Sequence, residues 1–269
     1  MIHAFRGAAA VLTGASHGIG EAIALQLSAQ GARLVLAARR ADELDRVARA
    51  CRAAGAADVL VVPTDVTDPA ACAALIDRAV AAYERIDLLV NNAGLGMWSR
   101  VDEVRDLTIF ERVLRVNYLG AVYCTHAALP YLKVSRGRIL CVSSLAGRTG
   151  VPLRSGYAAS KHAMGGFFDS LRIELAGTGV TITMVHPGFV ATGAQGRNLS
   201  ATGQPLGVVP IRMQDAMTAE DCAARCVAAA AARKRELVMT ARGKFGVWLK
   251  LLLPGLVDRV AAKAIAEGK

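Results

Sequence analysis

Short apolar segments alternate with amphipathic segments along almost the whole chain. Each apolar segment has the length of a strand, and the segments are 8–14, 32–38, 58–63, 86–92, 137–144, 179–187 and 236–240. Helical periodicity marks the intervening segments 18–30, 41–54, 68–83, 156–176 and 218–232, and much of 101–132. Continuously apolar strands joined by helices predict an α/β fold, in which helices cover both faces of a doubly wound parallel sheet.

The length of 269 residues fits one α/β domain. We find no internal repeat and no linker, so we predict a single domain over 1–269. Within it, 189–215 is rich in glycine, proline and polar residues and is the expected substrate loop. Residues 242–269 form an apolar and amphipathic tail, whose most apolar tract is too short to span a bilayer.

Charge and cysteine usage limit the function classes. The net charge is +10, but the basic residues are scattered, and no block is longer than Arg233–Arg235. An ordinary solvated surface is the first interpretation, and an anionic ligand or membrane surface is the alternative. No nucleic-acid-binding motif is present. The six cysteines lack zinc-site spacing, so we expect no metal and reduced thiols in the cytoplasm.

Unusual polar and glycine-rich clusters follow six of the predicted strands. They read "TGASHGIG", "ARR", "TDVTD", "NNAG", "SS" and "HPG". In open parallel sheets, ligands bind beyond the carboxyl ends of the strands, where the strand order reverses. The clusters therefore predict one site at this edge of the sheet.

Three glycines, Gly14, Gly18 and Gly20, lie between the first strand and the first helix. Glycine there permits a tight turn and lets a pyrophosphate rest against the helix N-terminus. Ser16 and His17 lie in the turn and can donate hydrogen bonds to phosphate. A merely structural turn is the alternative.

The second strand ends in Arg39 and Arg40, where an NAD enzyme commonly has an acidic residue. A guanidinium binds a 2′-phosphate and a carboxylate repels it, so the sequence predicts NADP(H) over NAD(H). Asp65 follows the third strand and is a candidate partner of the adenine amino group. Alternatively, Asp65 belongs to the turn in which Asp68 and Pro69 begin the next helix.

Tyr157 and Lys161 lie one helical turn apart, with only small residues between them. A free phenol has a pKa near 10, and a nearby positive charge lowers it. The pair therefore predicts a tyrosine that exchanges protons near neutral pH. A surface tyrosine and lysine would be the simpler reading of an isolated pair.

This pair is not isolated. Ser144 and Asn117 precede it, and together with "TGASHGIG" and "NNAG" these residues closely resemble the short-chain dehydrogenase/reductase family from about residue 8 to 192. The resemblance implies a Rossmann-like sheet and a catalytic set of Asn117, Ser144, Tyr157 and Lys161. Tyr157 would be the general acid and base, Lys161 would lower its pKa and hold the nicotinamide ribose, and Ser144 would donate to the substrate oxygen. Asn117 would help hold Lys161 and a water.

The resemblance also implies which residues bind the cofactor. Asn91, Ala93 and Gly94 would contact the adenosine ribose, and the segment from Pro187 to Thr192 would hold the carboxamide. The full expected set is Gly14, Ser16, His17, Gly18, Ile19, Gly20, Arg39, Arg40, Asp65, Val66, Asn91, Ala93, Gly94, Tyr157, Lys161, Pro187, Gly188, Val190 and Thr192.

These observations predict reversible hydride transfer between NADP(H) and a carbonyl or alcohol carbon. An apolar pocket lined by Met97, Leu145, Val151, Leu153 and Phe189 favours a hydrophobic small-molecule substrate, with Arg148 and Arg154 of undetermined direction. A nucleotide sensor without turnover is the rival function. Family analogy predicts a homo-oligomer, and for the tail we rank an interface or a lid above peripheral membrane contact.

Overall fold

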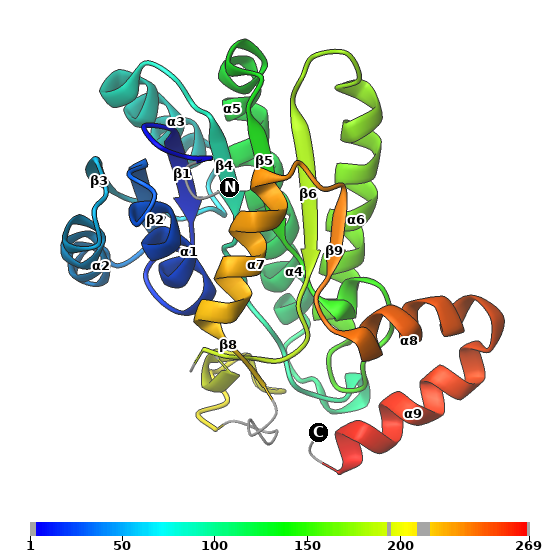
Figure 1. Cartoon of the computed structure of the whole chain (residues 1–269). Coiled ribbons are helices and arrows are strands. Elements are labelled where there is room, and N and C mark those ends of the chain that lie inside the picture. Colours follow the sequence, from blue (N-terminus) through cyan, green and yellow to red (C-terminus); the bar gives the residue numbers. More distant parts are fainter. Residues whose placement is uncertain (1–3, 193–194, 209–215, 268–269) are drawn as a thin grey trace.

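The structure is a computed structural model that describes residues 4–192, 195–208 and 216–267. A parallel sheet of seven strands, ordered β3-β2-β1-β4-β5-β6-β9, forms its centre, and helices lie on both sides (Figure 1). The order reverses between β1 and β4, which is the point where such sheets bind ligands. The predicted fold class is confirmed.

The predicted strands and helices are present with small shifts at their ends. The strands are β1 (Ala9–Thr13), β2 (Arg33–Ala38), β3 (Asp58–Pro63), β4 (Leu88–Asn91), β5 (Arg138–Val142), β6 (Thr181–His186), β9 (Glu236–Val238) and the short parallel pair β7 (Val190–Ala191) and β8 (Met217–Thr218). The main helices are α1 (Gly18–Ser28), α2 (Ala41–Ala53), α3 (Pro69–Tyr83), α4 (Thr108–Leu114), α5 (Gly120–Ser135), α6 (Ser155–Glu174) and α7 (Ala219–Ala231).

Alternation along each strand builds two cores, one on each face of the sheet. In β1, Ala10 and Leu12 pack with α1, α2 and α7, whereas Ala9 and Val11 face α3, α5 and α6. The inner strands are buried on both faces because helices cover both faces. This burial explains why the strands are apolar throughout rather than alternately apolar and polar.

The helical segment predicted over 101–132 is divided. A 3-10 turn (Val101–Glu103) precedes α4, and a π-helical turn, η2 (Arg115–Leu119), joins α4 to α5. A π turn changes which face of the helix a side chain points from, and such turns are frequent at functional sites. Asn117 lies in this turn, which periodicity alone does not reveal.

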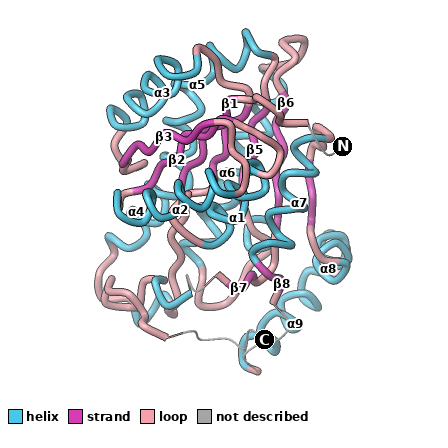
Figure 2. The backbone as a smooth tube through the Cα atoms, turned by 60° about the vertical axis from the view of Figure 1, so that its left-hand side comes forward, coloured by secondary structure: helices cyan, strands magenta, loops and turns pink. Residues whose placement is uncertain are grey.

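The tail forms two helices, α8 (Ala241–Leu252) and α9 (Pro254–Ala266), which project from the sheet as a hairpin (Figures 1 and 2). The Thr240 hydroxyl begins α8 by accepting from the Gly243 N–H. Neither helix has a buried residue, and their exposed apolar side chains are Phe245, Trp248, Leu251, Leu252, Leu253, Leu256 and Val260. Within the described residues, every helix is too short or too polar to cross a membrane.

Candidate active site

One large cavity of about 830 Å³ lies at the carboxyl ends of the strands. Its walls come from the segments after β1, β2, β3, β4, β5 and β6 and from the start of α6. The six clusters that the sequence places after strands therefore meet at one cavity, as expected from the parallel topology.

The glycine turn after β1 is built for close approach. Gly14 and Gly18 have φ of 66° and 59°, a conformation that other residues rarely adopt. A Cβ atom on Gly20 would lie 2.2 Å from the Gly14 carbonyl oxygen, so Gly20 lets α1 pack against the turn. His17 does not cap α1 with its side chain, and the first amides of a helix have no partner within it. The turn can therefore receive an anion.

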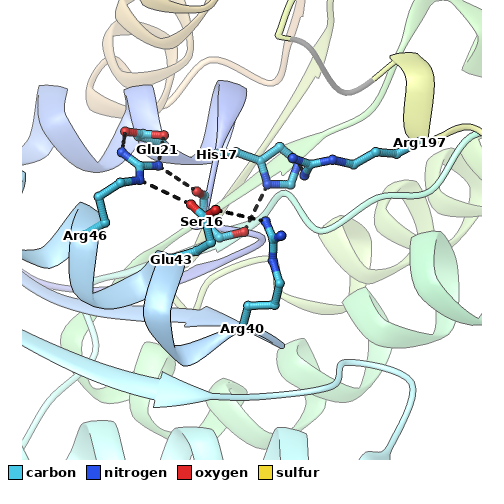
Figure 3. Close-up of polar contacts among 7 residues, drawn as sticks. All are labelled: Ser16, His17, Glu21, Arg40, Glu43, Arg46 and Arg197. Atoms are coloured by element: carbon cyan, nitrogen blue, oxygen red, sulfur yellow. Dashed lines mark hydrogen bonds and ion pairs between the residues drawn. The ribbon is translucent and has the colours of Figure 1, made fainter. Parts of the chain in front are cut away.

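Charged side chains fix this turn from the outside (Figure 3). Arg46 of α2 donates to both carboxylate oxygens of Glu21, at 2.7 and 2.8 Å, and to the Ser16 carbonyl at 3.1 Å. Glu43 pairs with Arg46 at 3.2 Å and with Arg40 at 3.5 Å. Two acidic residues thus hold Arg46 and Arg40, and Arg46 holds the turn.

Arg39 and Arg40 lie at the end of β2, are exposed and line the cavity. On the opposite wall, Arg197 reaches the turn, and its Nη1 lies 2.7 Å from His17 Nε2 (Figure 3). Burial and then the charges of Arg197 and Arg40 lower the pKa of His17 below 6.5, so its ring is neutral at pH 7 and can accept from Arg197. This end of the cavity is strongly basic.

The segment after β3 combines the two interpretations of Asp65. Asp65 lines the cavity, and its carboxylate also accepts from the Thr67 N–H and hydroxyl, at 2.9 and 2.8 Å. Asp68 caps α3 by accepting from the Ala70 N–H at 2.9 Å, with Pro69 in the first turn. Asp65 is therefore part of the turn and part of the cavity wall at once.

The side chain of Asn91, an expected cofactor contact, lies outside the cavity wall. It points away from the cavity and donates to the Thr125 hydroxyl at 2.9 Å. Asn92 lines the cavity instead and donates to the carbonyls of Thr13 and Gly14, at 3.1 and 3.0 Å. Alternation at the end of β4 turns neighbouring side chains to opposite faces, and two identical letters hide which one faces the site.

Ser144, Tyr157 and Lys161 all line the cavity, beyond the carboxyl end of β5 and on the first turns of α6. The Lys161 ammonium lies 5.8 Å from the centre of the Tyr157 ring and donates to the Val142 carbonyl at 2.9 Å. Lys161 is almost fully buried, with 4% of its surface exposed. The expected pair therefore lies in a desolvated site.

Burial alone would raise the pKa of Tyr157. The charges of Lys161 and Arg154, together with a hydrogen bond from Ser144, outweigh burial and bring this pKa below 10.0. Burial is also the main reason that the pKa of Lys161 falls below 10.5. The pKa of Tyr157 is thus shifted in the direction that the sequence predicts, and Arg154 contributes as a second cation.

Asn117 lies outside the cavity wall and connects backbone elements. Its side chain accepts from the Leu95 N–H at 2.7 Å and donates to the Leu95 carbonyl at 2.9 Å and to the Ser160 hydroxyl at 2.8 Å. Lys161 donates to Val142 and Met164 rather than to Asn117. The expected support of Lys161 is therefore indirect, through the segment after β4 and through α6.

His186 supports the backbone of Ser144. Its Nδ1 lies 3.1 Å from the Ser144 carbonyl, and its Nε2 lies 3.0 Å from a Glu236 oxygen. The carbonyl can only accept, so Nδ1 carries a proton. Burial lowers the pKa of His186 below 6.5. His186 therefore links the end of β6 to the Ser144 backbone and to Glu236 of β9.

At the substrate end, the structure corrects the expected apolar lining. Only Phe189 of the five proposed residues borders the cavity. Met97 is fully buried, and the Gly156 N–H donates to its sulfur at 3.2 Å. Trp98 and Arg154 line the cavity, whereas Arg148 lies outside it and pairs with Glu236 at 3.3 Å. These directions depend on the loop before α6, whose shape the sequence does not show.

Of the expected cofactor-binding residues, all but Gly20 and Asn91 line the cavity. The substrate loop 189–215 is described only in part, since 193–194 and 209–215 lie outside the described residues. Its described part lines the cavity with Arg197, Asn198, Leu199, Gly203, Gln204 and Pro205. Thr64, Arg112 and Arg115 also line the cavity and were not predicted from the sequence. For the two arginines, their position close to Asn117 in the sequence could have indicated this.

The six cysteines are free and buried. Among the residues that the structure describes, no cluster of three or more histidine, cysteine or acidic residues could bind a metal. The cavity instead fits a dinucleotide. Its glycine turn lines the cavity at the N-terminus of α1, where a pyrophosphate would rest, and Arg39 and Arg40 lie where a ribose phosphate would end.

Comparisons with known proteins agree with this geometry. The sequence pattern of the short chain dehydrogenase family matches residues 8–202. The chain is 38% identical to 11-beta-hydroxysteroid dehydrogenase A of Sesamum indicum, over 94% of this chain and 74% of that protein. It is 33% identical to a dehydrogenase/reductase SDR family protein 7-like of Dictyostelium discoideum, over 96% of this chain and 82% of that protein.

A solved structure is also similar. It is an alcohol dehydrogenase from the archaeon Thermococcus sibiricus, complexed with 5-hydroxy-NADP. The TM-score is 0.72 at 27% identity, and the match covers 86% of this chain and 94% of that one. The chain therefore belongs to the short-chain dehydrogenase family and is an NAD(P)-dependent oxidoreductase that acts on CH–OH or carbonyl groups.

Proposed function

We propose that this short-chain dehydrogenase transfers hydride reversibly between NADP(H) and the carbonyl or alcohol carbon of a substrate with a hydrophobic body. The observation that carries the proposal is the placement of Ser144, Tyr157 and Lys161 in the same cavity as the glycine turn and Arg39. A bound nicotinamide would supply or accept the hydride. The side chains of this protein bind and orient the cofactor and substrate and transfer the proton.

Tyr157 handles the proton in this proposal. During reduction its hydroxyl gives a proton to the substrate oxygen, and during oxidation its phenolate takes the proton of the alcohol. Lys161 and Arg154 stabilise the phenolate by their charge. The Ser144 hydroxyl, held at the end of β5, donates to the oxygen on which negative charge develops. These donors are fixed before the substrate arrives, so little reorganisation is needed.

The preference for NADP(H) is supported by charge. Arg39 and Arg40 line the cavity at the end of β2 and offer guanidinium groups to a 2′-phosphate. Glu43 already pairs with Arg40. Among the described residues Arg39 forms no ion pair, which makes it the more available of the two. The 5-hydroxy-NADP in the archaeal relative adds support.

The hydrophobic body of the substrate is supported by Trp98, Phe189 and Leu199 in the cavity wall. Several relatives carry the name 11-beta-hydroxysteroid dehydrogenase, which also speaks for a large apolar substrate class. Intact Ser144, Tyr157 and Lys161 disfavour the rival function of a nucleotide sensor without turnover.

A screen of NADPH oxidation tests the function. The purified protein is incubated with NADPH and with ketones, aldehydes, steroids, retinoids and acyl thioesters, and the loss of NADPH absorbance is measured. The same panel is repeated with NADH in place of NADPH. We expect turnover with at least one class, faster with NADPH, and loss of it in Tyr157→Phe. Binding of NADPH with no turnover in the whole panel, and no difference in Tyr157→Phe, would favour the sensor.

We also propose that the chain forms a homo-oligomer, supported by the exposed apolar side chains of α8 and α9. Sedimentation of the wild type and Leu252→Asp tests it, with a smaller species expected for the variant. Equal sedimentation of both as monomers would contradict the proposal. The cytoplasmic location stays a prediction, which cell fractionation tests.

A further inference from the structure

The Arg154 guanidinium lies in the cavity within a group of aromatic rings. Its Cζ atom lies 4.2 Å from the ring centre of Tyr157, 5.7 Å from that of Phe189 and 5.8 Å from that of Trp98. The rings come from α6 and from the segments after β6 and β4, so only the folded chain assembles this group. The Tyr157 hydroxyl oxygen accepts a hydrogen bond from Arg154, whereas the aromatic faces attract the cation without offering its N–H groups a strong acceptor.

No carboxylate neutralises Arg154 within the described part of the chain, since none of its ion pairs includes this residue. Its Nε is buried without a hydrogen-bond partner. Burial also lowers the pKa of the guanidinium, because the charge has lost its water. A half-buried charge without a carboxylate partner and a buried donor atom without an acceptor both cost free energy. A ligand that brings an acceptor would remove both costs.

The backbone before α6 holds Arg154 in this place. Leu153 has φ of 66°, which costs energy for a leucine and persists only where the surroundings hold it. The Leu153 carbonyl accepts from the Ser99 N–H at 2.8 Å, and the Arg154 N–H donates to the Val151 carbonyl at 3.2 Å. Arg154 then lies three residues before Tyr157, and side chains with this spacing are neighbours on a helix.

On the basis of the proposed oxidoreductase function, we propose that Arg154 binds a carboxylate of the substrate. The enzyme would then act on an apolar ketone, or the matching alcohol, with a carboxylate a few bonds from the reacting carbon. The guanidinium fork matches the two oxygens of a carboxylate. Because the reacting oxygen must lie at Tyr157 and Ser144, the anion binds beside it, and the apolar body lies against Trp98 and Phe189.

Arg112 also lines the cavity, but its guanidinium is already engaged by the substrate loop. Its Nη1 donates to the Gly203 carbonyl at 3.0 Å and thereby holds the loop. Arg154 therefore differs from Arg112 in burial and in its unpaired donor. Substrate recognition is assigned to Arg154 alone.

The test compares benzoylpropionate with its methyl ester, which share an aryl ketone and differ in the carboxylate. We measure kcat/KM for both with NADPH and take the ratio of acid to ester within each variant. Any effect of Arg154 on Tyr157 acts on both substrates and cancels in the ratio. The wild type should prefer the acid by about 10- to 100-fold, the range expected for a charge-assisted pair. In Arg154→Met the ratio should fall to about one.

Arg148→Met is the matched control, because Arg148 lies outside the cavity and pairs with Glu236. This variant loses the same charge and should keep the wild-type ratio. A wild-type preference for the ester, or a preference for the acid that survives in Arg154→Met, would overturn the proposal. Turnover of the ester in either case would leave the oxidoreductase function intact.

A binding measurement separates the proposal from turnover. Trp98 lies beside Arg154, and Trp248 is the second of two tryptophans, so Trp248→Phe leaves Trp98 as the reporter. Fluorescence titration of this protein with benzoylpropionate in the presence of NADP+ should show tighter binding than its ester, and Arg154→Met should abolish the difference. If no carbonyl is turned over but this difference is found, the proposed function fails and the Arg154 site stands. Equal binding of acid and ester overturns the site.

Discussion

Beside the glycine turn, carboxylates hold Arg46 and Arg40 but not Arg39, whereas at the α6 end aromatic rings surround Arg154. Arg46 and Arg40 pair with Glu21 and Glu43. Within the described residues, Arg154 has no carboxylate partner and lies among the rings of Tyr157, Phe189 and Trp98, with a hydrogen bond to the Tyr157 hydroxyl. An arginine with its own carboxylate shapes the protein, because its charge is already neutralised. An arginine without one keeps its charge for a ligand or for a neighbouring phenolate.

Removal of Lys161, which lies beside Tyr157 on α6, should have the largest effect. Lys161→Ala removes the charge that lowers the pKa of Tyr157, so kcat/KM should fall by about 100- to 10,000-fold, the usual contribution of acid–base catalysis. Steady-state kinetics measure the loss, and a melting curve shows whether the variant folds. Near-normal turnover in a folded variant would remove Lys161 from the mechanism.

Arg39→Ala probes the cofactor end. It removes a partner of the 2′-phosphate, so KM for NADPH should rise by about 10- to 100-fold while KM for NADH changes little. Arg33→Ala is the control, because Arg33 begins the same strand and its Nε donates to the Gly7 carbonyl away from the cavity. Equal weakening of both cofactors by Arg39→Ala would contradict the assigned preference.

Arg154→Met probes the other end through pH. The wild-type charge lowers the pKa of Tyr157, so the phenolate forms at a lower pH than it would without Arg154. Alcohol oxidation needs the phenolate, and its rate rises with pH through this pKa. The rising part of the plot of oxidation rate against pH should therefore move to higher pH in Arg154→Met and should not move in Arg148→Met. An unchanged position in Arg154→Met would show that Arg154 leaves the proton transfer unaffected.

Arg46→Ala should have the smallest effect. The pair with Glu21 is partly exposed, and such pairs are worth about 1 kcal/mol or less. Loss of the hydrogen bond to the Ser16 carbonyl should loosen the glycine turn. The affinity for NADPH should then fall a few-fold, and the affinity for NADH should fall by the same factor. Isothermal titration with both cofactors measures this, and Arg46→Lys should retain part of the affinity. A selective loss of NADPH would instead place Arg46 at the 2′-phosphate.

Much of the cavity wall could be predicted because the topology is simple. In a parallel sheet every strand ends at the same edge, so residues directly after strands meet there whatever the loops do. Gly14, Arg39, Ser144 and Pro187 all line the cavity for this reason. Predictions that needed the direction of a side chain were weaker. The Asn91 side chain lies outside the cavity wall, Asn92 lines the cavity, and Met97 is buried in the core.

The amino-acid sequence by itself determined the order of strands and helices, the glycine turn and the spacing of Tyr157 and Lys161. They depend on the spacing of apolar residues, on the backbone conformations that glycine allows and on the helical repeat, all of which act over a few residues. Only the tertiary structure decided that Arg154 faces Tyr157, that Arg197 reaches His17 and that Asn117 acts through Leu95. Arg197 with His17 and Asn117 with Leu95 join segments far apart in the sequence, and Arg154 takes its direction from the loop before α6. The conformation of these segments depends on packing across the fold rather than on local preference.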